Sequence, residues 1–151
     1  MDRALPNNMS YVRIWIHAVW ATKYRQPALH RDIRPAIFEH ILTNGRSKGI
    51  FIDRANGYVD HAHALISLGS EQTIAKAIQL IKGESAYWIN KTGITQAKFQ
   101  WQDRYYAVSV SESQIETVRD YIDRQESHHQ QRTFAEEYME FALTHHLSTI
   151  E

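Results

Sequence analysis

The sequence contains no cysteine, which excludes disulfide bonds and zinc–thiolate centres. This composition fits a reducing cytoplasm, where we expect the protein to reside. The sequence also lacks an apolar run of the ~20 residues that a membrane helix needs. Its opening stretch, MDRALPNNMS, lacks the apolar core of a secretory signal peptide. We therefore predict a cytoplasmic protein with no membrane partner.

A surplus of either charge is missing as well, because 17 basic side chains balance 17 acidic ones. This balance argues against attraction to nucleic acid over the whole surface, although it is compatible with a local basic patch. Repeats, low-complexity stretches and domain linkers are also absent. The 151 residues, 43% of them hydrophobic, suffice for one domain with a buried core. We expect a loose tail over residues 1–9 and a single domain over residues 10–151.

Hydrophobic periodicity predicts four strands and four helices. Period-two alternation favours strands over 11–21, 50–55, 58–68 and 104–110, and helical spacing favours helices over 31–48, 71–91, 114–125 and 133–147. The dipeptide Asn56–Gly57 predicts the tight turn of a hairpin between the second and third strands. The order β-α-β-β-α-β-α-α indicates an α+β sandwich with an antiparallel sheet, helices packed mainly on one face, and further helices at the C-terminus.

Two histidines stand one residue apart in the apolar stretch YVDHAHALISL (residues 58–68). Because alternate residues of a strand point to one face, His61 and His63 should lie side by side, ~7 Å apart along the chain. This pair is a candidate metal site, although two ligands alone would bind a metal weakly. A half-buried strand whose histidines face solvent or a neighbouring segment is the alternative that the stretch leaves open.

A second candidate cluster lies near the C-terminus, in the stretch VRDYIDRQESHH. Tyr121 and Gln125 are four residues apart, so on a helix they would be neighbours, and His128 would continue the same face. A phenol, an amide oxygen and an imidazole in a row have the parts of a reactive surface. The same pattern also fits an ordinary boundary tyrosine followed by solvated polar residues.

Five segments together resemble the single-tyrosine HUH transposases of bacterial insertion sequences, including relatives associated with repeated extragenic palindromes. The matching segments are HAVWATKYRQP (17–27), DHAHALISL (60–68), IKGESAYWIN (81–90), FQWQDRYYAVSVS (99–111) and YIDRQESHH (121–129). The resemblance implies a ferredoxin-like or RRM-like sandwich whose C-terminal helices carry the reactive tyrosine. It further implies that His61, His63 and Gln125 are metal ligands, with His128 as an alternative ligand, and that Tyr121 is the nucleophile.

The activity that the resemblance implies is the cutting and rejoining of single-stranded DNA. Attack by a tyrosine on phosphorus gives a 5′-phosphotyrosine that conserves the phosphodiester energy and can be reversed by the released 3′-hydroxyl. A tyrosine with an ordinary pKa near ~10 needs assistance at neutral pH, which Mg²⁺ or Mn²⁺ would supply by polarising the phosphate. The expected partners are single-stranded DNA with hairpin, palindromic ends and a second copy of the chain in a homodimer. The resemblance implies composite sites in this dimer, with the tyrosine helix of one chain facing the histidines of the other.

Basic and aromatic residues supply candidate contacts to DNA. These candidates are Lys23, Arg25, Lys82, Arg104 and Tyr105. An ordinary solvated surface is an equally good interpretation of any one of them.

Three other classes compete with this interpretation. A histidine-triad hydrolase would need a third histidine at position 65, which is a leucine. A phosphodiesterase that uses water would leave Tyr121 without a role. A non-catalytic nucleic-acid-binding domain is the main alternative, although all four residues of the expected site are present.

Overall fold

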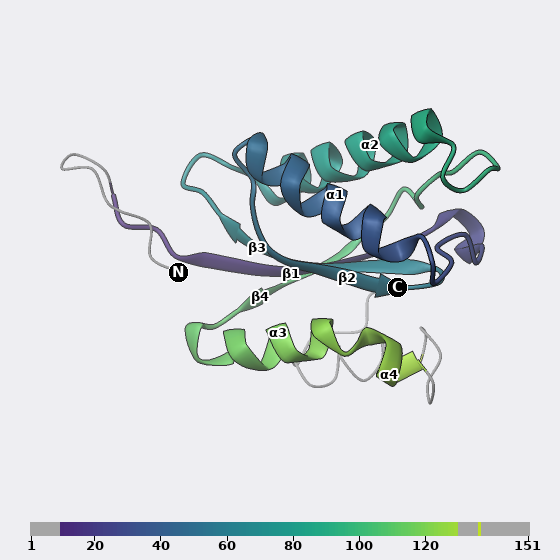
Figure 1. Ribbon diagram of the computed structural model, residues 1–151. Helices are drawn as coiled ribbons and strands as arrows, with labels where there is room; N and C mark the ends of the chain where they lie inside the picture. Colours follow the sequence, from purple (N-terminus) through teal and green to yellow (C-terminus); the bar gives the residue numbers. More distant parts are fainter. Residues whose placement is uncertain (1–9, 130–135, 137–151) are drawn as a thin grey trace.

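The computed structural model describes residues 10–129 and residue 136, and its centre is a four-stranded antiparallel sheet with helices on both faces (Figure 1). The elements are β1 (Ile14–Ala21), η1 (Lys23–Arg25), α1 (Arg34–Ser47), β2 (Phe51–Tyr58), β3 (His61–Leu68), α2 (Ile74–Thr92), β4 (Tyr106–Val110), η2 (Glu112–Gln114), α3 (Ile115–Asp123) and α4 (Gln125–His129). The strand order is β2-β3-β1-β4, with every neighbouring pair antiparallel. The predicted α+β class is confirmed. Within the described residues, none of the helices combines the length and the apolar character needed to cross a lipid bilayer.

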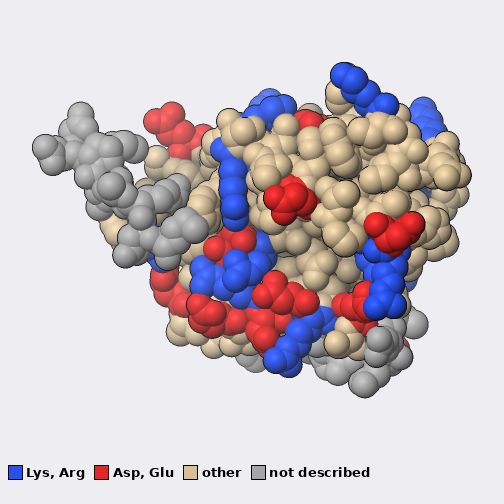
Figure 2. Space-filling view, in the orientation of Figure 1, with Lys and Arg blue, Asp and Glu red and all other residues tan. Residues whose placement is uncertain are grey.

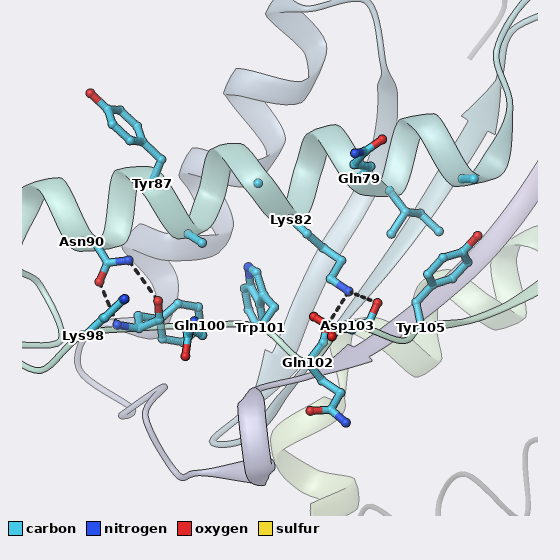
Figure 3. Close-up of a pocket in the computed structure, with 15 residues that line it drawn as sticks. Gln79, Lys82, Tyr87, Asn90, Lys98, Gln100, Trp101, Gln102, Asp103 and Tyr105 are labelled. Carbon is cyan, nitrogen blue, oxygen red and sulfur yellow. Dashed lines mark hydrogen bonds between the residues drawn. The ribbon is translucent and has the colours of Figure 1, made fainter.

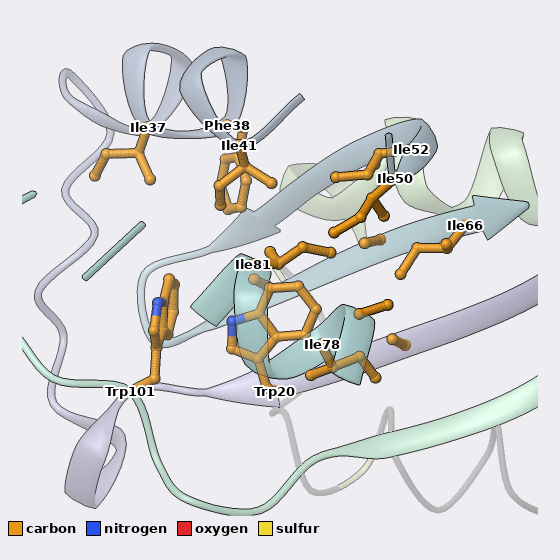
Figure 4. Close-up of a cluster of buried hydrophobic side chains, with 14 of the residues drawn as sticks. Trp20, Ile37, Phe38, Ile41, Ile50, Ile52, Ile66, Ile78, Ile81 and Trp101 are labelled. Carbon is orange, nitrogen blue, oxygen red and sulfur yellow. The ribbon is translucent and has the colours of Figure 1, made fainter. Parts of the chain in front are cut away.

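The helices α1 and α2 cover one face of the sheet and enclose the larger core (Figures 1 and 4). Its principal side chains are Trp20, Ile37, Phe38, Ile41, Ile52, Ile66, Ile78 and Ile81. Trp101 belongs to the same core, where its indole lies edge-on to Trp20 at 5.9 Å between ring centroids. Each large apolar side chain buried here contributes about 1.5–3 kcal/mol to folding, so this layer is the main source of stability.

The opposite face of the sheet is covered by α3 and α4 (Figure 1). A second apolar cluster joins α3 to the sheet through Trp15, Leu65, Val110, Ile115, Val118 and Ile122. All eight residues of β3 are therefore buried, including both histidines. The half-buried strand that the sequence left open is wrong, because the C-terminal helices close over that face; the histidines face these neighbouring helices and not solvent.

Polar contacts fix α3 in position on β2. The Arg119 guanidinium donates to both carboxylate oxygens of Asp53, at 2.6 and 3.1 Å, and this hydrogen bonding raises the pKa of Arg119. Asp53 itself is 4% exposed, so its charge depends on this partner. The Asn56 side chain donates to the carbonyl of Ile122 at 2.9 Å. Together these bonds hold the helix that carries Tyr121.

The predicted hairpin turn at Asn56–Gly57 is wrong, because both residues lie inside β2 and the chain reverses at residues 59–60. A Cβ atom at Gly57 would lie 2.2 Å from the His61 carbonyl oxygen and 2.8 Å from Phe38 Cζ. The glycine therefore permits close packing of β2 on its neighbours and does not form the turn. The third strand accordingly begins at His61 and not at residue 58.

The prediction of one continuous helix over 114–125 is wrong, because the structure has two separate helices in this region. Its first part, α3, ends at Asp123, and Arg124 adopts φ −102° and ψ 24° before α4 begins at Gln125. The first and last strands begin later than predicted, at Ile14 and Tyr106. The helix predicted over 133–147 lies outside the described residues, apart from residue 136.

Candidate active site

The two histidines of β3 lie together on the face covered by α3 and α4. Their exposed fractions are 0% for His61 and 1% for His63, and their ring centroids are 5.0 Å apart. The Nδ1 atom of His61 lies 2.8 Å from a carboxylate oxygen of Asp60. The Nδ1 atom of His63 lies 2.9 Å from Nε2 of His17. Each imidazole is therefore oriented through Nδ1, which leaves Nε2 as the nitrogen for a reactive partner.

His17 belongs to this cluster although the sequence alone did not assign it a role. It lies in β1, where its direct cross-strand partner is Leu65, and His63 is the diagonal neighbour on the same face. The His17 side chain is 0% exposed. The sequence does place His17 on the same face of its strand as Trp15, because the two residues are two positions apart. Nothing in the sequence specified that β1 pairs with β3. Asp60 was also missed, although it directly precedes His61 in the sequence and contacts its Nδ1 atom.

Gln125 brings an amide oxygen to the first histidine. Its Oε1 atom lies 3.2 Å from Nε2 of His61, and the side chain is 0% exposed. The short helix α4 is held in place by Glu126, whose carboxylate pairs with Arg31 at 2.8 Å and with Arg34 at 3.2 Å. Gln125 thus reaches the histidines even though the helix is interrupted immediately before it.

Tyr121 completes the cluster from the last turn of α3. Its ring centroid lies 5.7 Å from that of His63 and 6.1 Å from that of His17, both edge-to-face. The side chain is half-buried. Four predicted site residues, Tyr121, His61, His63 and Gln125, are therefore gathered within a single chain. His128 lies in α4, but its side chain is outside the described part of the structure.

The donor set at this cluster consists of imidazole nitrogens and one amide oxygen. Among the described residues, no group of three or more His, Asp and Glu side chains is arranged to hold a metal. When the Nδ1–H of His61 donates to Asp60, the Nε2 lone pair of His61 and Oε1 of Gln125 face each other as two acceptors. A proton or a cation between them satisfies both atoms. The donor chemistry therefore fits a divalent ion with open coordination positions.

The basic turn after β1 lies beside the histidines. Lys23 and Arg25 belong to η1, in which Tyr24 and Arg25 have positive φ angles of 57° and 53°. Arg25 lies 3.7 Å from the carboxylate of Asp60, which in turn contacts His61. Two of the predicted DNA-binding residues are therefore adjacent to the cluster.

The other three predicted DNA-binding residues border a groove between α2 and residues 98–105 (Figure 3). Tyr105 lines the groove, and Arg104 is exposed next to it. The Lys82 ammonium donates to the carbonyl oxygens of Gln102, Asp103 and Arg104. Burial lowers the pKa of Lys82 from its ordinary 10.5, against the opposing effect of Asp103. Lys82 is therefore engaged in holding the loop.

Surface charge does not form a single-sign field on the side shown in Figure 2. Basic and acidic side chains alternate over the lower part of this face, where α3 and α4 lie. The pairs there include Arg54 with Asp123 and Arg119 with Glu116. On this face, attraction of an anionic molecule would depend on local groups and not on a broad basic field.

Comparisons with known proteins identify related sequences. The family model described as "Transposase IS200 like" matches residues 10–125. The chain is 24% identical over 115 residues to the ISDra2 transposase TnpA of Deinococcus radiodurans, covering 72% of this chain and 81% of that protein. It is 25% identical over 115 residues to the transposase for insertion sequence element IS200 of Salmonella typhimurium, covering 72% of this chain and 74% of that protein.

Solved structures share the fold. A protein of Deinococcus radiodurans R1 assigned as a transposase superposes with a TM-score of 0.64 at 20% identity, covering 82% of this chain and 98% of that one. A REP-associated tyrosine transposase bound to a REP hairpin superposes with a TM-score of 0.56 at 15% identity, covering 83% of this chain and 74% of that one. These likenesses confirm the α+β sandwich.

Proposed function

Because the chain belongs to the family of IS200-like transposases, we propose that it cuts and rejoins single-stranded DNA by metal-assisted transesterification, with Tyr121 as the nucleophile. The observation that carries this proposal is the convergence of Tyr121 on the histidine pair. The Tyr121 ring lies 5.7 Å from His63, and both histidines are oriented through Nδ1. A buried cluster of this kind suits chemistry on a substrate better than a role in packing alone.

The metal site that we propose is formed by Nε2 of His61, Nε2 of His63 and Oε1 of Gln125. Asp60 and His17 would hold the two imidazoles in the tautomer that offers Nε2. A bound Mg²⁺ or Mn²⁺ would polarise the scissile phosphate and offset the charge that develops on it. His128 remains the alternative third ligand, and a structure with bound Mn²⁺ would distinguish the two.

The covalent step uses the hydroxyl of Tyr121. Its oxygen forms a bond to phosphorus as its proton leaves, and the bond from phosphorus to the 3′-oxygen of the preceding nucleotide breaks. That oxygen takes up a proton and departs as a free 3′-hydroxyl, while the 5′-phosphate stays on Tyr121. The reverse reaction, with a different 3′-hydroxyl, joins a new strand without an external energy source.

The DNA that we propose as substrate ends in a hairpin. The support is the fold shared with a REP-associated tyrosine transposase bound to a REP hairpin. We also propose a homodimer, because two-fold pairing is the commonest assembly of such chains. Tyr121 and the histidines approach each other within one chain, so the second copy need not complete the site. Mixing His63→Gln chains with Tyr121→Phe chains should therefore restore no activity.

The decisive experiment is a search for the covalent intermediate. Single-stranded DNA with a hairpin near the cleavage point should give a protein–DNA adduct that survives denaturation and requires divalent metal. The adduct should disappear in Tyr121→Phe, which retains DNA binding, and should persist in the matched control Tyr105→Phe. Cleavage without any adduct would refute the mechanism, and DNA binding without cleavage would favour a non-catalytic binding domain.

A further inference from the structure

A groove of about 500 Å³ runs between α2 and the segment 98–105, on the face of the sheet opposite the histidines (Figure 3). Its walls combine exposed aromatic rings with side-chain amides. Tyr87 is 62% exposed and Tyr105 is 40% exposed, and the amides come from Gln79 and Gln102, whereas the Asn90 amide bonds to the Phe99 backbone. Stacking surfaces beside hydrogen-bonding groups are typical of sites for single-stranded nucleic acid.

The floor of this groove contains a glycine that the folded chain itself does not require. Gly83 lies in the middle of α2, and a Cβ atom added to it would meet nothing within 4 Å. Gly45, the glycine of α1, differs because its Cβ atom would lie 2.4 Å from Cδ1 of Ile52. Glycine weakens a helix interior by about 1 kcal/mol relative to alanine, and Gly83 is exposed on the groove side of α2. Packing explains Gly45, whereas an external molecule that approaches the backbone would explain Gly83.

The groove is lined by two lysines, Lys82 and Lys98, and by one acidic residue, Asp103, so its lining carries a small basic excess. Lys98 lines the groove, is exposed and forms no ion pair with any described residue. Lys91 lies one turn from Tyr87, with its ammonium 5.7 Å from the ring centroid. Lys82, in α2, donates hydrogen bonds to the carbonyl oxygens of Gln102 and Asp103, and these bonds fix the spacing between the two walls of the groove. A polymer with a phosphate backbone and flat bases matches this combination.

The groove is continuous with the proposed active site through the basic turn. Its outer wall runs beside that turn, because Lys23 N–H donates to the Gln100 carbonyl at 3.0 Å. The turn then reaches Asp60 through Arg25, at 3.7 Å, and Asp60 contacts His61. The turn η1 therefore contacts both the groove wall, through Gln100, and Asp60, the residue that orients His61.

We propose that this groove binds the single-stranded DNA that adjoins the cleavage point, with one nucleotide lying against Gly83 between Tyr87 and Tyr105. This proposal rests on the proposed function, because it names a second contact for the same substrate. Gly83 allows the nucleotide to approach the helix backbone, and the two tyrosines supply stacking surfaces. The groove thus adds affinity for the substrate at a distance from the reacting phosphate.

The test measures equilibrium binding of a fluorescent single-stranded oligonucleotide by anisotropy, in the presence of a chelator so that no cleavage occurs. Gly83→Ala should raise the melting temperature of the free protein, because alanine favours the helix. The same substitution should weaken DNA binding about 10-fold, and so should Tyr87→Ala, which removes one base–aromatic stack. Tyr87→Phe should bind like the natural chain. Leu80→Ala lies on the same helix outside the groove and should leave binding unchanged.

The outcomes separate this proposal from the proposed function. If the natural chain forms the Tyr121 adduct while Gly83→Ala and Tyr87→Ala bind DNA normally, the groove proposal is wrong and the transposase mechanism stands. If both substitutions weaken binding but no adduct ever forms, the groove is supported and the mechanism fails. If Gly83→Ala changes the sedimentation of the protein but not its DNA affinity, a second copy of the chain occupies the groove and the proposal is overturned.

Discussion

Replacement of His17 tests whether it orients His63 for the proposed metal site. The two imidazoles are 2.9 Å apart, from Nε2 of His17 to Nδ1 of His63, and both side chains are almost fully buried. A metal on Nε2 of His63 requires the proton of that ring on Nδ1, so His17 must accept it. His17→Leu removes this acceptor and leaves water little access to replace it.

The magnitude follows from the cost of a buried donor without an acceptor, about 1–3 kcal/mol. Without metal, His63 can carry its proton on either ring nitrogen, whereas a metal on Nε2 fixes the proton on Nδ1, where His17→Leu offers no acceptor. The part of the cost that is specific to the bound state should weaken Mn²⁺ binding, by up to roughly 150-fold. His17→Gln keeps an acceptor oxygen near the same position, so its Mn²⁺ affinity should stay within a few-fold of the natural chain.

The assay is a titration with Mn²⁺ in the absence of DNA, with free Mn²⁺ followed by electron paramagnetic resonance. Thermal unfolding without metal serves as the control for the fold, and His17→Leu should leave it nearly unchanged because an apolar side chain suits the buried position. The reasoning is refuted if His17→Leu binds Mn²⁺ like the natural chain. It is equally refuted if His17→Gln loses as much affinity as His17→Leu, since packing and not the hydrogen bond would then be responsible.

Three further substitutions test the packing and the charges around this site. Gly57→Ala should lower the free energy of unfolding by about 1–3 kcal/mol in urea, because its Cβ atom would lie 2.2 Å from the His61 carbonyl oxygen. Arg119→Leu should cost about 2–3 kcal/mol by leaving the buried Asp53 carboxylate with only the longer, 3.4 Å contact to Arg54, and the double variant with Asp53→Asn should recover part of this loss. Hydrogen bonds from Arg13 lower the pKa of Glu112 from its ordinary 4.5, so its contribution to stability is complete above pH ~4.5 and is lost as the pH falls through the lower, folded-state pKa. Glu112→Gln should therefore flatten the acid limb of a plot of unfolding free energy against pH, and an unchanged acid limb would contradict this assignment.

Local periodicity in the sequence was sufficient to predict most elements of this fold. Alternation located all four strands to within a few residues, and helical spacing located α1 and α2 almost to their ends. The shared face of His61 and His63 also followed from the sequence alone, because side chains two apart on a strand must point the same way. The nearness of Tyr121 to Gln125 survived the break at Arg124, since four residues span little distance in either conformation.

Contacts between distant segments were decided only by the tertiary structure. Nothing local states that β1 lies beside β3, and without that pairing His17 is one polar residue among others. The role of Gly57 likewise depends on His61 and Phe38 crowding its α-carbon, whereas its sequence context resembles a turn. The burial of the histidines depends on α3, which reaches β2 through Arg119 and Asp53 at a sequence separation of 66 residues. Periodicity records which face of an element is apolar, but the identity of the segment that covers that face is set by packing of the whole chain.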